Sequence, residues 1–316
     1  MTNDLPVTRR AALAAGAAAI GAVLTRTAAA DEPRLPWGDA HSHIWPPDVD
    51  KYPLAPGQTK KDLDPPGFTD EELLKVARPE GVGRVVLIQH SVYHLWDNAY
   101  LLDAVKRQPK SFRAQGMVDD HKPDPGAAMK KLFPLGVTGF RITPFVRPKD
   151  EQSKWLDTPG MAEMWTTAAE TRQAMCPLVN PADLPRIDAM CAKHPDTPVV
   201  VDHFGRVGAD GEVRETDVKA LCALARHPHA HVKVSAFYAL GKKKPPYDDL
   251  VPMIRRLVDA FGPKRLMWAS DSPYQLQGGN TYAASIGLVR DRLDFLSKAD
   301  REWLLAKTAE TVFFYA

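Results

Sequence analysis

Short apolar runs alternate with helical segments along almost the whole chain. Runs such as 83–90 and 198–203 are nearly continuous in Val, Leu and Ile, as expected for strands buried on both faces of a parallel sheet. The predicted strands are 37–45, 83–90, 112–118, 136–142, 176–180, 198–203, 232–237 and 265–271. Strict strand–helix alternation over this length favours a single-domain α/β fold, the (β/α)8 or TIM barrel, over an open doubly wound sheet.

The segments between these strands carry helical patterns. Thr69, followed by three acidic residues, has the character of an N-cap and predicts a helix reaching about Arg78. The other predicted helices are 98–107, 126–134, 161–173, 184–193, 216–226, 250–261, 281–296 and 298–313. No GxGxxG follows the first strand and no P-loop occurs, which argues against a nucleotide-binding sheet.

The N-terminus has the composition of a targeting segment. Arg9 and Arg10 precede a short apolar run, 11–24, and the small residues 28–30 suit a cleavage site. The paired arginines resemble the bacterial twin-arginine signal, which implies export of the folded protein to the periplasm. We therefore expect residues 1–30 to be removed and 31–316 to form the barrel, with an uncleaved N-terminal anchor as the alternative.

Charge and cysteine content exclude several classes of protein. The chain has 41 Lys and Arg against 39 Asp and Glu, and its one short basic block, 242–244, is too small for a nucleic-acid footprint. Its three cysteines, scattered without CxxC spacing, do not form a disulfide framework. After removal of the signal no membrane span is expected, and the expected partner is a small molecule.

The stretch 37–45 contains two histidines at strand spacing. In an extended strand, residues two apart point to one face, so Asp39, His41 and His43 are expected to project together. Two imidazoles beside a carboxylate suit either a divalent metal ion or a substrate carbonyl. A His-x-His pair also occurs on ordinary surfaces, so the rest of the chain has to decide.

Polar side chains follow several of the apolar runs. They are His43 after the first, His90 after the second, Arg141 after the fourth, His203 after the sixth and Asp271 after the eighth. Each has a structural alternative, such as a loop hydrogen bond, a surface ion pair or a turn. In a TIM barrel the carboxyl ends of the strands form the active face, so together these side chains predict a convergent site.

Three segments point to a family. The stretches 39–43, 201–206 and 265–271 resemble the amidohydrolase-2 family, in its branch of 2-pyrone-4,6-dicarboxylate lactonase and sugar-acid lactonases such as fuconolactonase. The likeness runs from about Trp37 to the C-terminus. It implies a TIM barrel that hydrolyses a C–O, C–N or occasionally a C–C bond.

The resemblance also implies a set of site residues. His41 and His43 match the first-strand pair, His203 the sixth-strand histidine and Asp271 the eighth-strand aspartate. Binuclear members have a lysine or glutamate after the fourth strand and a histidine after the fifth, where this chain has Arg141 and Asn180. The resemblance thus implies either one zinc or manganese ion on His41, His43 and Asp271, with His203 near, or a metal-free lactonase.

From these residues we derive the hypothesis that Asp271 is the general base, which activates water for attack on a lactone or ester carbonyl. His41, His43 and His203 polarise that carbonyl and stabilise the oxyanion. Arg141 is the candidate that grips a substrate carboxylate. Arg206 and Arg147 are weaker alternatives for this role, and the other candidates for substrate contact are Trp45, Tyr52, His90, Asn180 and Tyr238. The alternatives are a metal-dependent decarboxylase of the same family and a non-enzymatic binding protein on a barrel scaffold.

Overall fold

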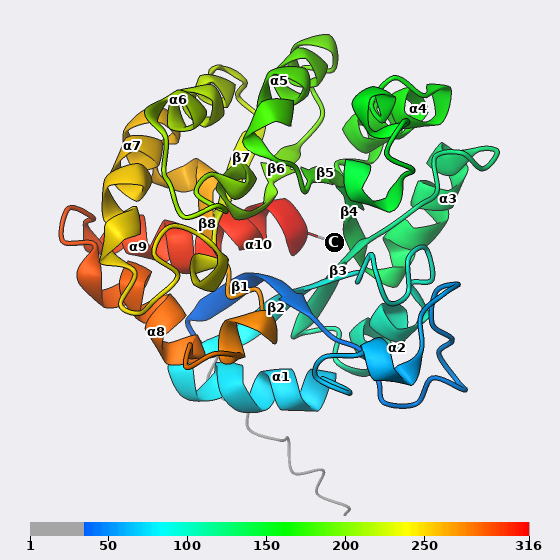
Figure 1. Cartoon of the computed structure of the whole chain (residues 1–316), viewed down its shortest axis with the longest axis horizontal. Helices are drawn as coiled ribbons and strands as arrows, with labels where there is room; N and C mark the ends of the chain where they lie inside the picture. The colour runs from blue at the N-terminus through cyan, green and yellow to red at the C-terminus, as the bar shows by residue number, and fades with distance from the viewer. Residues whose placement is uncertain (1–34, 316) are drawn as a thin grey trace, which may run out of the picture. The chain divides into compact units, whose positions relative to one another are not determined.

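Eight parallel strands form one sheet in sequence order, with helices outside it, in the computed structural model of the chain (Figure 1). The structure describes residues 35–315, and the predicted signal segment, 1–30, lies outside this range. The strands are β1 Trp37–His43, β2 Val82–Ile88, β3 Phe112–Gly116, β4 Val137–Ile142, β5 Ala174–Pro177, β6 Val199–Val201, β7 Ala230–Val234 and β8 Leu266–Trp268. The predicted TIM barrel is confirmed.

The helices follow the strands, and α1 to α8 surround the sheet (Figure 1). They are α1 Asp70–Ala77, α2 Ala99–Arg107, α3 Pro125–Leu132, α4 Pro159–Thr171, α5 Leu184–Lys193, α6 Glu215–Ala223, α7 Val251–Phe261, α8 Tyr282–Gly287, α9 Lys298–Glu302 and α10 Thr308–Phe313. Thr69 caps α1 through a reciprocal pair of hydrogen bonds with Glu72, as the sequence predicts. No helix within residues 35–315 combines the length and the apolar character that a membrane span needs.

The C-terminal helix α10 closes the amino-terminal end of the barrel. Its Phe313 is fully buried among interior strand residues such as Val86 and Val200. Glu310 pairs with Arg84 near the start of β2, which places the helix at that end. A substrate must therefore enter from the carboxyl ends of the strands.

The barrel closes where the chain after β8 meets β1. The Asp271 backbone N–H donates to the carbonyl oxygen of His41 over 2.8 Å, and the His43 N–H donates to Ser272 over 2.7 Å. This seam holds two of the predicted site segments in fixed register, although they are more than 200 residues apart in sequence.

Asp39 stabilises the same seam rather than joining the histidines. Its buried carboxylate accepts hydrogen bonds from the backbone N–H groups of His41 and Ser270 and from the hydroxyls of Ser42, Ser270 and Tyr282. The register between β1 and β2 is irregular between Asp39 and Ser42, so the simple two-residue alternation fails there. The prediction that Asp39 projects with His41 and His43 is wrong, because its carboxylate is fully engaged by the seam.

The C-terminal helices are more broken than the sequence predicts. The predicted helix 281–296 ends as an α-helix at Gly287 and continues as a wider π-helical turn, Leu288–Arg292. The predicted helix 298–313 is likewise divided into α9 and α10 by a π-helical turn, Trp303–Lys307. These turns widen the helix locally, a change that apolar periodicity alone does not reveal.

Candidate active site

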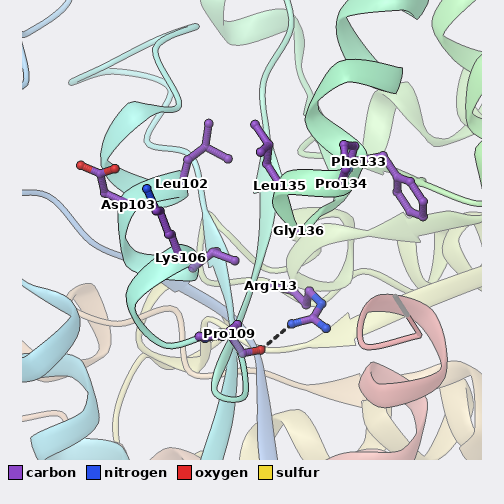
Figure 2. A pocket seen from close by; sticks show the side chains of 10 residues that line it. Leu102, Asp103, Lys106, Pro109, Arg113, Phe133, Pro134, Leu135 and Gly136 are labelled. Atoms are coloured by element: carbon purple, nitrogen blue, oxygen red, sulfur yellow. Dashed lines mark hydrogen bonds between the residues drawn. The ribbon is translucent and has the colours of Figure 1, made fainter.

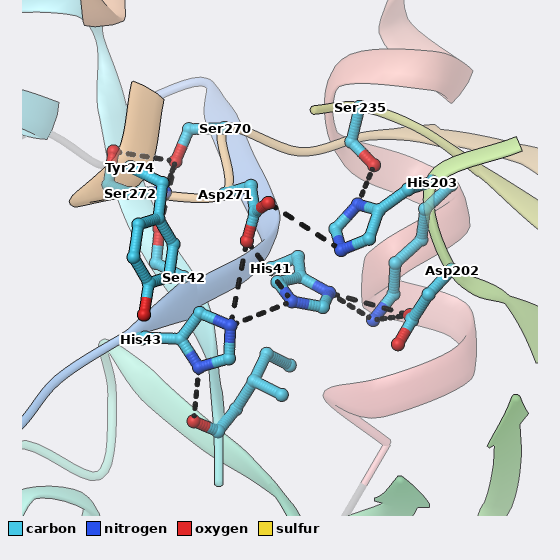
Figure 3. Close-up of polar contacts among 12 residues, drawn as sticks. His41, Ser42, His43, Asp202, His203, Ser235, Ser270, Asp271, Ser272 and Tyr274 are labelled. Atoms are coloured by element: carbon cyan, nitrogen blue, oxygen red, sulfur yellow. Dashed lines mark hydrogen bonds and ion pairs between the residues drawn. The ribbon is translucent and has the colours of Figure 1, made fainter. Parts of the chain in front are cut away.

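A cavity of about 610 Å³ opens at the carboxyl ends of the strands. It is lined by His43, His90, Ser91, Val92, Tyr93, Arg141, Leu178, His203, Arg206, Ala209, Ala236, Tyr238, Ala239, Leu240, Lys243, Asp271 and Tyr274. At its floor, side chains from β1 and from the ends of β6 and β8 point toward one another (Figure 3). The position is the one where TIM-barrel enzymes place their active sites.

Three ligand-type atoms form a nearly equilateral triangle at this floor. The Nε2 atoms of His41 and His43 lie 3.4 Å apart. Asp271 Oδ1 lies 3.5 Å from each of them. The three side chains are at most 7% exposed, so water does not separate the atoms freely. The sequence-based prediction that these residues lie close together holds in the structure.

A hydrogen bond fixes where the proton of His43 sits. His43 Nδ1 lies 3.1 Å from the carbonyl oxygen of Ile88, which can only accept, so Nδ1 carries the proton. Arg141 Nη2 lies 2.8 Å from His41 Nε2, and Lys233 Nζ lies 3.1 Å from His41 Nδ1. Both nitrogens of the His41 ring therefore face a donor, and these contacts do not assign its proton. The unprotonated Nε2 of His43 faces Asp271.

Burial keeps these imidazoles neutral. Burial, followed by the charge of Lys233, holds the pKa of His41 well below its ordinary value. Burial, followed by Arg141, does the same to the pKa of His43. Burial also lowers the pKa of His203. Neutral imidazole is the form that ligates metal ions and accepts hydrogen bonds.

The donor set can hold a metal ion. Two ligands of a tetrahedral zinc with bonds of about 2.0–2.1 Å are about 3.4 Å apart, close to the spacings in this triangle. Within residues 35–315, Asp271 Oδ1 is buried and has no hydrogen-bond donor, as expected for an oxygen that faces a cation. His41, His43 and Asp271 thus fit one divalent ion by residue type and spacing.

His203 faces the same carboxylate from the opposite side. Its Nε2 lies 3.7 Å from Asp271 Oδ2, and its Nδ1 lies 2.8 Å from Ser235 Oγ. His203, Phe204 and Arg206 all have positive φ, between 50° and 57°, in a left-handed turn directly after β6. Non-glycine residues rarely adopt this backbone, and such strain is found preferentially at functional sites.

Comparisons with known proteins agree with this geometry. Residues 39–315 match the model of the amidohydrolase family. The chain belongs to the amidohydrolase family. It is 30% identical to a 4-sulfomuconolactone hydrolase of Hydrogenophaga intermedia, over 75% of this chain and 74% of the relative.

Two further matches lie in the same family. The chain is 29% identical to an L-fucono-1,5-lactonase of Burkholderia ambifaria, over 77% of this chain and 82% of the relative. Its fold matches that of a Burkholderia multivorans amidohydrolase crystallised with bound zinc, with a TM-score of 0.73 and 21% identity over 88% of this chain and 99% of the other. The protein is therefore a hydrolytic enzyme of the amidohydrolase superfamily, and both relatives named here from the sequence comparison are lactone hydrolases.

Aromatic side chains form one wall of the amidohydrolase cavity. Tyr238 donates a hydrogen bond from its hydroxyl to Asp271 Oδ2 over 2.8 Å. His90 stacks on Tyr93 with 3.9 Å between ring centroids, and its Nε2 lies 2.5 Å from the Tyr274 hydroxyl. Of these residues the sequence analysis proposed Tyr238 and His90, and both line the cavity.

Cationic side chains face the cavity from the other strands and loops. Arg141, on β4, is 4% exposed, and its Nη2 contacts both His41 and Asp202. Arg206 lies over the Phe145 ring at 5.1 Å, and Lys243 donates to the Ala209 carbonyl oxygen. Among the described residues that line the cavity, Asp271 is the only carboxylate.

Four predicted substrate residues do not line the cavity. Trp45 is buried behind its wall and donates to the Pro65 carbonyl, and Tyr52 points to Asp103, to which its hydroxyl donates over 2.6 Å. Asn180 is exposed at the start of a 3₁₀ turn. Arg147 pairs with Asp120 and His121 instead. Loop residues can be assigned to a cavity only after their own partners are known.

The sequence analysis missed a polar group beneath His41. Lys233 lies near the carboxyl end of β7, Gln115 lies on β3, and Asp202 directly follows β6, and all three are fully buried. A lysine or glutamine inside an otherwise apolar barrel strand is the signal that could have revealed them, because barrel interiors are normally filled by branched apolar side chains.

A second, slightly larger groove lies away from this chemistry. It has a volume of about 680 Å³ and lies between α2 and the segments that precede β3 and β4 (Figure 2). Its surface is mainly Leu102, Val105, Phe133, Pro134 and Leu135. It lies toward the amino-terminal ends of the strands, remote from the histidines, so the active-site assignment goes to the smaller cavity.

Proposed function

We propose that this amidohydrolase opens a lactone ring with Asp271 as the general base. The observation that supports this role is the position of the Asp271 carboxylate, which faces His41, His43 and His203 at the floor of the cavity. A carboxylate fixed beside neutral imidazoles can take a proton from water while donors stabilise the oxyanion.

The proposed reaction follows from the contacts of each side chain. Asp271 takes a proton from water as the water oxygen attacks the carbonyl carbon, and Tyr238 holds the carboxylate through its other oxygen. Arg141 and His203 stabilise the developing oxyanion. When the ring C–O bond breaks, Asp271 returns the proton to the leaving oxygen, and a hydroxy acid results.

We also propose one divalent ion, zinc or manganese, on His41, His43 and Asp271. When bound, such an ion supplies Lewis-acid polarisation and lowers the pKa of a coordinated water. The alternative is a metal-free site in which the same histidines and Arg141 contact substrate directly. The Burkholderia multivorans amidohydrolase, which is similar in fold, was crystallised with zinc. The spacing of the three donor atoms in this chain also supports a metal site over a metal-free one.

The proposed function is tested by metal content and lactone hydrolysis together. The purified protein should contain about one zinc or manganese per chain, hydrolyse a lactone in a screen that follows acid release, and lose activity on chelation. Activity that survives chelation would exclude the metal but leave Asp271 as base. Release of CO2 from aromatic acids, without lactone hydrolysis, would instead favour a decarboxylase.

Replacing His203 with alanine should reduce kcat about 10²–10³-fold, the scale for losing one oxyanion-stabilising donor. The His203→Ala protein should still fold, because the side chain faces the cavity. The matched control is His229→Ala, since His229 is exposed and outside the cavity. Equal kcat in His203→Ala and the wild type would contradict the assignment.

We propose further that the substrate is an anionic lactone. Arg141, Arg206 and Lys243 line the cavity, and Asp271 is the only carboxylate among its described lining residues. The name of the 4-sulfomuconolactone hydrolase relative describes an anionic lactone and supports this choice over a neutral sugar lactone.

Replacing Arg206 with methionine should raise KM for an anionic lactone about tenfold or more, the scale for losing a hydrogen bond to a charged group. KM for a neutral lactone should change much less, because that substrate has no charge for Arg206 to bind. Steady-state kinetics on both substrates check this, with Arg214→Met, an exposed arginine outside the cavity, as the control. A parallel rise in both KM values would argue against charge recognition.

Finally, we propose that the enzyme is exported to the periplasm by the twin-arginine route. Support comes from Arg9 and Arg10, the apolar run 11–24 and the small residues 28–30. Cell fractionation of the wild type and of an Arg9→Lys, Arg10→Lys variant tests the route. A periplasmic location that is unaffected by the double replacement would exclude it.

A further inference from the structure

Arg141 contacts the same nitrogen of His41 that the proposed metal ion needs. Its Nη2 lies 2.8 Å from His41 Nε2. The other two proposed ligand atoms, His43 Nε2 and Asp271 Oδ1, lie 3.4 Å and 3.5 Å from that nitrogen. A ring nitrogen has one lone pair, which accepts either an N–H donor or a metal ion. The guanidinium and the ion therefore compete for His41.

This competition does not depend on where the His41 ring carries its proton. Lys233 Nζ lies 3.1 Å from Nδ1, so each ring nitrogen faces one cationic donor. If the proton is on Nδ1, the lone pair of Nε2 accepts from Arg141. If the proton is on Nε2, that nitrogen has no lone pair to offer. In either tautomer, a metal ion can bind His41 only after the contacts around Nε2 change.

The charge of Arg141 strengthens the competition. A guanidinium stays protonated in proteins, so it repels a divalent cation at the same nitrogen. Arg141 is 4% exposed and His41 is fully buried, so water screens this repulsion poorly. The position beside His41 Nε2 therefore suits one cation at a time, either the guanidinium or the metal ion.

The guanidinium of Arg141 is only partly satisfied where it lies. Within residues 35–315, its hydrogen bonds to His41 and Asp202 both start from Nη2, and its Nε is buried without an acceptor. A buried donor without a partner is costly. Arg141 also lines the cavity, where a carboxylate of a bound substrate could accept two of its N–H groups at once. The side chain therefore has both a reason and room to leave His41.

We propose that Arg141 is a switch between two forms of this active site. In one form its guanidinium donates to His41 Nε2 and supplies the positive charge there. In the other form a divalent ion binds Nε2, and Arg141 turns into the cavity to hold the carboxylate of an anionic lactone. This inference rests on the metal ion and the substrate class of the proposed function. It accounts for the fact that a metal site and a metal-free site fit the same residues.

Zinc affinity is the first test, measured by chelator competition on the metal-depleted full-length protein. Arg141→Met removes the competing donor and its charge. It should bind zinc about 10–100-fold more tightly than the wild type, the scale for removing a hydrogen bond from a charged group. Asp202 keeps its ion pair with Lys233, at 2.9 Å, so the variant should fold. A zinc affinity that is unchanged or weaker would overturn the proposal.

The matched control is Arg206→Met, the same substitution in the same cavity. Arg206 lies over the Phe145 ring, 5.1 Å from its centroid. This variant loses one positive charge from the cavity but leaves the Arg141 contact with His41 in place, so its zinc affinity should change much less. An equal gain in both variants would show that the overall charge of the cavity weakens zinc binding, and the proposed competition at His41 would be wrong.

A second measurement uses the wild type and needs no variant. A crystal structure with zinc should show the ion on His41 Nε2 and Arg141 Nη2 beyond hydrogen-bond distance of that atom. Zinc on Nε2 with Arg141 still in contact would overturn the proposal. Zinc bound by Arg141→Met but not by the wild type would support it, because the competition would then be complete. If Arg141→Met does not fold, the wild-type structure decides.

Neither readout uses a substrate, so this inference and the proposed function can fail separately. If the lactone screen fails while Arg141→Met gains zinc affinity, the lactone assignment is wrong and the competition at His41 stands. If neither the wild type nor Arg141→Met binds zinc, the metal ion and the switch are both wrong. Lactone hydrolysis would then still test Asp271 as the base.

Discussion

Replacing Asp271 with asparagine should lower kcat about 10³-fold or more, within the range for a general base. The amide keeps the size and the hydrogen-bonding reach of the carboxylate but cannot take a proton from water. The Tyr238 hydroxyl, which donates to Oδ2 in the wild type, can still donate to the amide oxygen, so the local structure should persist. KM should change little, because the substrate contacts come from other side chains.

The measurement is steady-state hydrolysis of the best lactone from the screen, with circular dichroism to establish that the variant folds. Asp294→Asn is the matched control, since the Asp294 side chain is 91% exposed. Near-normal turnover by Asp271→Asn would exclude Asp271 as the base. Loss of bound metal together with turnover would show that Asp271 acts also as a ligand, which the proposed site includes.

The fold could be predicted because each strand is identified by its own residues. Every predicted strand overlaps an observed one, since a buried parallel strand needs a continuous apolar run. The residues at which each strand begins and ends were less predictable. The run 198–203 contains only a three-residue strand, Val199–Val201, because the chain turns left-handed from His203. That turn brings His203 Nδ1 to Ser235, a residue 32 positions away that no local pattern identifies.

The site residues at the ends of strands could be predicted from the sequence. The ion pairs between side chains that are distant in sequence could not. Topology brings the ends of parallel strands together, so His41, His43, His203 and Asp271 converge once the barrel is assumed. The sequence shows Lys233 as a lysine within an apolar strand, but it does not show that Asp202 is the residue with which it pairs. In the same way, Arg147 is a plausible anion ligand in sequence, but its pairing with Asp120 removes it from the cavity.

Acid should destabilise the metal-depleted protein steeply below about pH 6.5. Burial holds the pKa of His41 and of His43 well below the ordinary value and lowers that of His90 to about 3. The unfolded chain titrates these groups near 6.5, so below that pH it binds protons that the folded chain does not. The stability from neutral burial is fully present above about pH 6.5 and is lost as the pH falls toward the folded-state values.

In this window each such histidine lowers the free energy of unfolding by about 1.4 kcal/mol for each pH unit of acidification. The three together therefore approach about 4 kcal/mol per pH unit, and His203 changes the free energy of unfolding in the same direction. Denaturant unfolding between pH 8 and pH 5 measures the slope. The His90→Asn variant should have a slope that is smaller by the contribution of about one proton. The reason is that His90 is 6% exposed and contacts Tyr274 and Tyr93 in its neutral form. His229→Asn, at an exposed position, should leave the slope unchanged. A free energy of unfolding that stays constant from pH 7 to pH 5.5 would mean that the histidines at the floor of the cavity accept protons in the folded protein. The neutral imidazoles that metal binding and the Asp271 mechanism require would then not exist at those pH values.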